Sequence, residues 1–91
     1  MLFRGLRKME QPPFDAFRYG LASLLVRRPH LRCHASIAHW WTYELENYAF
    51  AIRARDRFRS NADYTLTAEY ETLCRDIEDE LEGCMTIEEN P

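Results

Sequence analysis

The chain has little that would interrupt a helix and little that would support catalysis. Only three of its 91 residues are glycine and four are proline, so most of the backbone is free to form regular structure. The sequence contains no Gly-rich phosphate-binding loop, no G-x-S-x-G nucleophile elbow and no Cys/His arrangement typical of a catalytic site. We therefore predict that the chain is not an enzyme and needs no cofactor.

Long apolar runs are also missing. No stretch approaches the roughly 20 apolar residues of a membrane-spanning helix, so no membrane partner is expected. The cysteines, Cys33, Cys74 and Cys84, are odd in number and cannot form a complete set of disulfides. In a helix, Cys74 and Cys84 would lie roughly 15 Å apart, which is beyond disulfide reach. These features predict a cytoplasmic protein with reduced thiols.

Charge is plentiful and unevenly distributed. The formal net charge is −3, but residues 1–33 carry seven Lys/Arg against two acids, whereas residues 61–91 carry ten acids against a single arginine. Such asymmetry indicates either charged partners or internal docking of the two ends of the chain.

The spacing of apolar residues predicts an all-α fold. A first helix is expected to begin at Pro12 or Pro13, where proline is tolerated, and to end before Pro29. A second, long helix is expected to begin within residues 29–36 and to run to Arg59.

The third predicted helix follows a turn at residues 60–63 and has the most regular pattern. Thr65 or Thr67 is expected to cap it. Its apolar residues recur at steps of three and four, which predicts one buried stripe made of Leu66, Tyr70, Leu73, Ile77, Leu81 and Cys84.

One alternative to the helical interpretation stays open. Arginine occupies every second position from Arg53 to Arg59, and alternation of this kind is a strand signal. Residues 53–68 could therefore form a β-hairpin, although the flanking segments favour helix–turn–helix.

The whole chain, residues 1–91, is expected to form a single helical domain, either a small three-helix bundle or a helical hairpin with an additional N-terminal helix. Residues 1–11 would be a basic N-terminal arm and residues 86–91 an acidic frayed tail. Met1 and Met9 are alternative starts.

The second helix carries two apolar stripes, which is a wider apolar surface than a simple surface helix needs. The stripe that includes Leu45, Tyr48 and Ile52 is expected in the core. The other stripe is either additional core or an aromatic binding face, for which Trp40, Tyr43 and Phe50 are the candidates.

Five carboxylates follow one another closely in the third helix and are expected on its solvent side: Asp76, Glu78, Asp79, Glu80 and Glu82. Asp76, Asp79, Glu80 and Glu82 are candidates for a face that binds the basic surface of another protein. The competing interpretation is that basic residues of the first two helices neutralise this face internally.

Two further clusters have weaker signals. Arg53, Arg55, Arg57 and Arg59 are candidates for a nucleic-acid-binding face, although the pI near 5.6 argues against nonspecific binding. A His/Cys cluster lacks any C-x-x-C pair, so we predict no metal site but exposed histidines and one buried thiol; it consists of His30, Cys33, His34 and His39.

The leading functional hypothesis is a non-enzymatic protein-binding module that acts as a regulator, adaptor or inhibitor. One specific form is a phage or mobile-element inhibitor whose acidic helix mimics nucleic acid. The alternatives are a dimeric nucleic-acid-binding protein that uses the Arg53–Arg59 face and a small structural subunit of a larger assembly. A homodimer is compatible with each of these hypotheses.

Overall fold

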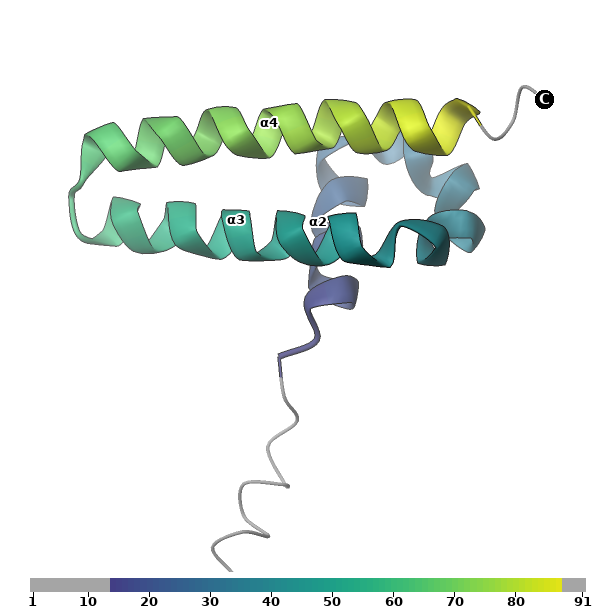
Figure 1. Cartoon of the computed structure of the whole chain (residues 1–91), viewed down its shortest axis with the longest axis horizontal. Coiled ribbons are helices and arrows are strands. Elements are labelled where there is room, and N and C mark those ends of the chain that lie inside the picture. Colours follow the sequence, from purple (N-terminus) through teal and green to yellow (C-terminus); the bar gives the residue numbers. More distant parts are fainter. Residues whose placement is uncertain (1–13, 88–91) are drawn as a thin grey trace, which may run out of the picture.

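The computed structural model describes residues 14–87, and all regular structure within this range is helical. Its elements are α2 (Ala16–Arg27), the 3₁₀ helix η1 (Pro29–Trp41), α3 (Thr42–Ser60) and α4 (Tyr64–Ile87). Helices α3 and α4 form an antiparallel hairpin, and α2 and η1 pack together behind it in Figure 1. The all-α prediction is confirmed, and the alternative of a β-hairpin at residues 53–68 is wrong.

Parts of the predicted domain lie outside the described residues. The basic arm at residues 1–11, with both alternative start methionines, is one of them. Of the predicted tail at residues 86–91, Thr86 and Ile87 belong to α4 and the remainder is not described.

Helix α2 begins later than predicted. Asp15 is its N-cap, and the Asp15 carboxylate accepts a hydrogen bond from the backbone N–H of Arg18 at 3.1 Å. This bond satisfies one of the free N–H groups of the first turn. Pro12 and Pro13 precede this cap, so the expected start was wrong. The predicted stop is correct, because the helix ends at Arg27 and Pro29 follows its C-cap.

The single long helix expected up to Arg59 is wrong, because the chain forms two helices there. The residues from Pro29 to Trp41 wind as a 3₁₀ helix, and Trp41 (φ −119°, ψ 40°) then leaves helical geometry before α3 begins. A turn of three residues places Leu31 and His34 on the same buried side. The break lets the chain change direction between α2 and α3.

Helix α4 is rotated about its axis relative to the prediction. Leu81 is buried as expected, but Leu73 is 42% exposed and was wrongly placed in the core. Apart from Leu81, the buried residues of α4 lie one position after those of the predicted stripe. They are Thr67, Cys74, Glu78, Leu81 and Met85, and Thr67 and Glu78 among them are polar. The former stripe therefore lies beside the core rather than at its centre.

Helices α2 and α3 cross very closely at one glycine. Gly20 is buried, and a Cβ atom added there would overlap the backbone carbonyl oxygen of Leu45 and lie 3.0 Å from its carbonyl carbon. Because a backbone atom is the obstacle, no side-chain rotation relieves the overlap. Any residue with a side chain would force the two helices apart.

The turn between α3 and α4 is closed by backbone hydrogen bonds. The N–H of Asp63 donates to the carbonyl of Phe58 at 2.9 Å, and the N–H of Ala62 donates to the carbonyl of Arg59 at 3.0 Å, with Ala62 at φ 59°. This pair of bonds is the Schellman arrangement, in which the left-handed residue is usually glycine.

Asp63, and not a threonine, caps α4. Its side-chain Oδ1 accepts a hydrogen bond from the N–H of Leu66 at 3.2 Å. The Thr65 or Thr67 cap predicted from the sequence is therefore wrong. Thr67 instead donates its hydroxyl to the backbone carbonyl of Asp63 at 2.7 Å.

Replacing Ala62 with glycine is expected to raise the free energy of unfolding by about 1 kcal/mol, because glycine adopts a left-handed conformation without the steric penalty of a Cβ atom. Ala68 lies in the exposed, regular part of α4, so Ala68→Gly should lower the same quantity by about 1 kcal/mol. Urea titrations followed by circular dichroism compare the two variants. A decrease in both would contradict the left-handed conformation at Ala62.

Candidate functional site

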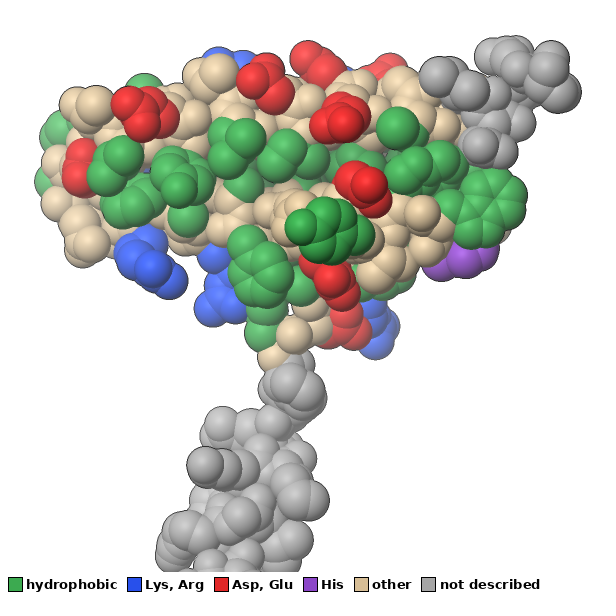
Figure 2. Space-filling view, in the orientation of Figure 1, with side chains coloured by type: hydrophobic (Ala, Val, Ile, Leu, Met, Phe, Trp, Pro, Cys, Tyr) green, Lys and Arg blue, Asp and Glu red, His purple; other side chains and the backbone are tan. Residues whose placement is uncertain are grey.

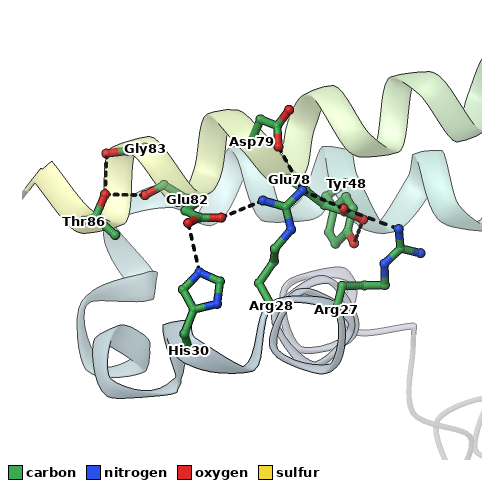
Figure 3. A network of polar contacts seen from close by, with 9 residues as sticks. All are labelled: Arg27, Arg28, His30, Tyr48, Glu78, Asp79, Glu82, Gly83 and Thr86. Carbon is green, nitrogen blue, oxygen red and sulfur yellow. Dashed lines mark hydrogen bonds and ion pairs between the residues drawn. The ribbon is translucent and has the colours of Figure 1, made fainter.

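The basic and acidic parts of the sequence meet at Arg28, the C-cap residue of α2 (Figure 3). Its Nη1 donates to Oε1 of Glu82 at 2.6 Å, and its Nη2 donates to Oδ1 of Asp79 at 2.9 Å and to Oε1 of Glu78 at 3.3 Å. The bonds to Asp79 and then Glu82 raise the pKa of Arg28 above its ordinary value. One arginine thus joins the end of α2 to three carboxylates of α4.

Glu78 is the buried member of this network, with only 1% of its surface exposed. Its Oε2 accepts a hydrogen bond from the Tyr48 hydroxyl at 2.6 Å, and its Oε1 lies 3.7 Å from Nη2 of Arg27 on the side that also faces Arg28. Burial, and then the bond to Glu78, raise the pKa of Tyr48 above its ordinary value of 10, which keeps its hydroxyl a hydrogen-bond donor well above neutral pH.

The expectation that Glu78 faces solvent is therefore wrong. A carboxylate is tolerated in a core only where hydrogen bonds and opposite charges replace its water, and Tyr48 and the two arginines do this here. Both oxygens of Glu78 have partners, so the arrangement fixes helices α2, α3 and α4 against one another.

The predicted acidic face is divided into two halves. Asp79 and Glu82 are directed toward Arg28, and Oε2 of Glu82 also lies 2.9 Å from Nε2 of His30 (Figure 3). Asp76 and Glu80 are exposed. The charges of Asp79 and Glu82 are therefore paired with Arg28 of the same chain, whereas Asp76 and Glu80 are exposed and can meet a partner.

Acid is expected to destabilise the fold through Glu82. His30 and then Arg28 hold the pKa of Glu82 below its usual value of 4.5. A lowered folded-state pKa gives stability that is complete above the unfolded-state pKa and is lost as the pH falls through the folded-state pKa. The melting temperature of Glu82→Gln should therefore fall less steeply below pH 4.5 than that of the native chain.

Melting curves recorded by circular dichroism between neutral pH and about pH 2 test this expectation. Glu80→Gln is the matched control, because Glu80 is exposed on the same helix and its removal should leave the slope unchanged. Parallel curves for the native chain and Glu82→Gln would show that Glu82 does not carry the effect.

The predicted arginine face is dispersed around α3. Arg55 donates to its neighbour Asp56 at 2.9 and 3.0 Å, and Arg59 donates to Glu71 of α4 at 2.9 Å. The guanidinium of Arg53 stacks over the ring of Phe14, 4.0 Å from its centroid. Arg57 is exposed. Three of these four arginines therefore contact groups of this chain.

The aromatic candidates are all exposed. Tyr43 is 70% exposed, Phe50 56% and Trp40 57%, the last on η1 rather than on α3. The heptad spacing of Tyr43 and Phe50 places both on one side of α3. On α4, Leu66 and Leu73 have the same spacing.

Hydrophobic side chains form a band along α3 and α4 on the face shown in Figure 2, opposite α2, and acidic side chains interrupt it toward the right of the view. The rings of Phe58 and Tyr70 join the two helices within it, with centroids 5.3 Å apart. We define the apolar band by helical spacing and exposure as Tyr43, Phe50, Ala54 and Phe58 of α3 with Leu66, Tyr70, Leu73, Ile77 and Cys84 of α4. Helical spacing in the sequence indicates the α3 part of this surface, whereas it places the α4 residues of the band in the core.

A cavity of about 320 Å³ opens between α2 and α3, and sequence reasoning gave no indication of it. Its polar lining includes Arg27, Tyr48 and Arg55, all of which already face carboxylates of this chain. These three side chains are therefore already paired within this chain.

The His/Cys cluster is arranged differently from the expectation, because His34 is buried and Cys33 is exposed. Within residues 14–87, no group of three or more His, Cys, Asp or Glu side chains is placed to hold a metal ion. Over the same range, no helix combines the length and the apolar character needed to cross a membrane.

Comparisons with known proteins gave no relatives: no family model matches the chain, and neither a curated protein nor a solved structure matches it.

Proposed function

We propose that this chain is a non-enzymatic protein-binding module, a small regulator, adaptor or inhibitor, that binds its partner through the apolar band. The observation that carries the proposal is the exposure of Tyr43, Phe50 and Leu73 on one side of a well-packed helical hairpin. Large side chains of this kind are enriched at protein interfaces, and contiguous exposed apolar patches commonly mark them.

The acidic residues at the margin of the band indicate which charge the partner carries. Asp76 and Glu80 lie on the outer side of α4, next to Leu73 and Ile77 in helical spacing. A partner that covers the band would gain from an apolar centre with basic side chains at one edge. Nucleic-acid mimicry by the whole acidic helix is less well supported, because Asp79 and Glu82 bind Arg28.

The nucleic-acid alternative has less support than the protein-binding proposal. Counterion release requires arginines that are free to contact phosphates, whereas Arg53, Arg55 and Arg59 contact groups of this chain. No observation in the described structure favours that function over protein binding.

Affinity capture from a lysate of the source cell, after nuclease treatment, tests the proposal. The native chain is expected to retain a partner protein, and Tyr43→Asp is expected to lose that protein. Tyr64→Asp is the matched control, because Tyr64 is 73% exposed on α4 but lies two residues before Leu66 and so on a different side of the helix. If Tyr43→Asp retains the same proteins as the native chain, the band is not the binding surface.

A further inference from the structure

We infer that the apolar band binds a second copy of this chain, which forms a four-helix interface from two α3–α4 hairpins. This inference rests on the proposed function, because it uses the same surface and names its partner. Within the described residues, α2 and η1 cover only one face of the α3–α4 hairpin, and the band occupies the other (Figures 1 and 2). Two such faces placed together would bury both bands.

Symmetry fixes how the two copies can meet. A two-fold axis that lies in the plane of the interface and runs along the helices places α4 of one copy over α3 of the other. Because α3 and α4 are antiparallel and this rotation preserves direction along the axis, every neighbouring pair of helices is then antiparallel. The interface is isologous, so each contact between the copies occurs twice.

The margins of the band have opposite charges on the two helices. Arg53 and Arg57 lie on one line of α3, and Glu69, Asp76 and Glu80 lie on one line of α4, by their three- and four-residue spacing. Figure 2 shows acidic side chains along the α4 edge and basic ones along the α3 edge near the turn. The proposed two-fold axis brings the α4 edge of one copy to the α3 edge of the other.

The register inside each hairpin predicts a specific pair. Tyr48 of α3 and Glu78 of α4 are in contact, so they lie at the same level. Arg57 is nine residues after Tyr48 and Glu69 is nine residues before Glu78, so these two also share a level. Since the rotation preserves level, Arg57 of one copy faces Glu69 of the other.

The same register places Glu46 opposite Glu80, at the end of the hairpin distant from the turn. Complementarity is therefore confined to the half nearer the turn, where Arg57 lies, since Arg53 in the same half stacks on Phe14 of its own chain. A second copy is favoured over an unrelated partner because this chain itself carries both parts of a complementary surface. These are the apolar band and, on α3, a basic residue that can meet the exposed carboxylates of α4.

Sedimentation velocity of the full chain tests the inference. The native chain and Tyr64→Asp are expected to sediment as dimers at about 100 µM, within the micromolar range of many specific interfaces, and Leu73→Asp as a folded monomer by circular dichroism. Leu73 is half-exposed, so an aspartate there leaves the core unchanged. A monomeric native chain, or a dimer that Leu73→Asp leaves intact, would overturn the inference.

A charge exchange tests the orientation of the two copies. Arg57→Glu and Glu69→Arg should each raise the dimer dissociation constant roughly tenfold, because each change introduces two repulsive contacts at the margin. The double variant Arg57→Glu/Glu69→Arg should restore the native value. If the double variant is weaker than either single variant, the copies do not meet in this orientation.

The two proposals fail separately. A monomeric native chain that still captures another protein through Tyr43 would remove the second copy and leave the proposed function intact. A monomeric native chain that captures no protein would remove both proposals.

Discussion

Gly20→Ala is expected to lower the free energy of unfolding by at least about 3 kcal/mol, a large share of the stability of a small domain. The added Cβ atom would overlap the backbone carbonyl of Leu45, where α2 crosses α3. The two helices would have to separate, which would also loosen the packing of Leu24 and Leu45, both of them fully buried. Chemical denaturation followed by circular dichroism measures the loss.

Gly83→Ala provides the matched control. Gly83 is also a helical glycine, but nothing lies within 4 Å of a Cβ atom added there. The helix propensity of alanine should therefore raise stability by up to about 1 kcal/mol. Opposite signs for these two substitutions would identify the close helix crossing as the cause. A mild effect at Gly20 would mean that α2 and α3 lie further apart than described.

The all-α class and the turn at residues 60–63 could be predicted from the sequence because apolar spacing and turn composition are local signals. The break at Trp41 could not, since η1 forms only where the chain turns to bring α3 back over α2. Within α2 alone, Gly20 is a helical glycine of low helix propensity. Its role depends on the position of Leu45, which is remote in sequence.

The rotation of α4 has a similar cause. Counting apolar residues places Leu73 in the core and Glu78 in solvent, because a carboxylate is normally exposed. The structure reverses both, since Tyr48 and Arg28 supply the partners that a buried carboxylate needs. Those partners come from other helices, so no pattern within α4 could reveal them. The same rotation leaves Leu73 exposed and Leu66, Tyr70, Ile77 and Cys84 partly exposed, and these residues form the α4 part of the band.

Glu78→Ala is expected to lower the free energy of unfolding by about 3 to 5 kcal/mol, as the loss of one partner from a buried charged network usually does. The substitution removes the hydrogen-bond acceptor of the Tyr48 hydroxyl and leaves a cavity beside Leu81 and Met85, which are fully buried on the same side of α4. Glu80→Ala, two positions away and exposed, should change stability by less than about 0.5 kcal/mol.

A leucine at position 78 separates the need for a hydrogen bond from the need for volume. Glu78→Leu fills the space but leaves the Tyr48 hydroxyl buried without an acceptor, which should lower stability by about 1 to 3 kcal/mol. Adding Tyr48→Phe removes that hydroxyl, and most of the loss should be recovered, because Arg28 keeps Asp79 and Glu82. Thermal and urea denaturation of the native chain, both single variants and the double variant complete the cycle. If the double variant is as unstable as the sum of the single ones, Tyr48 and Glu78 are not coupled, and the buried network does not hold α3 to α4.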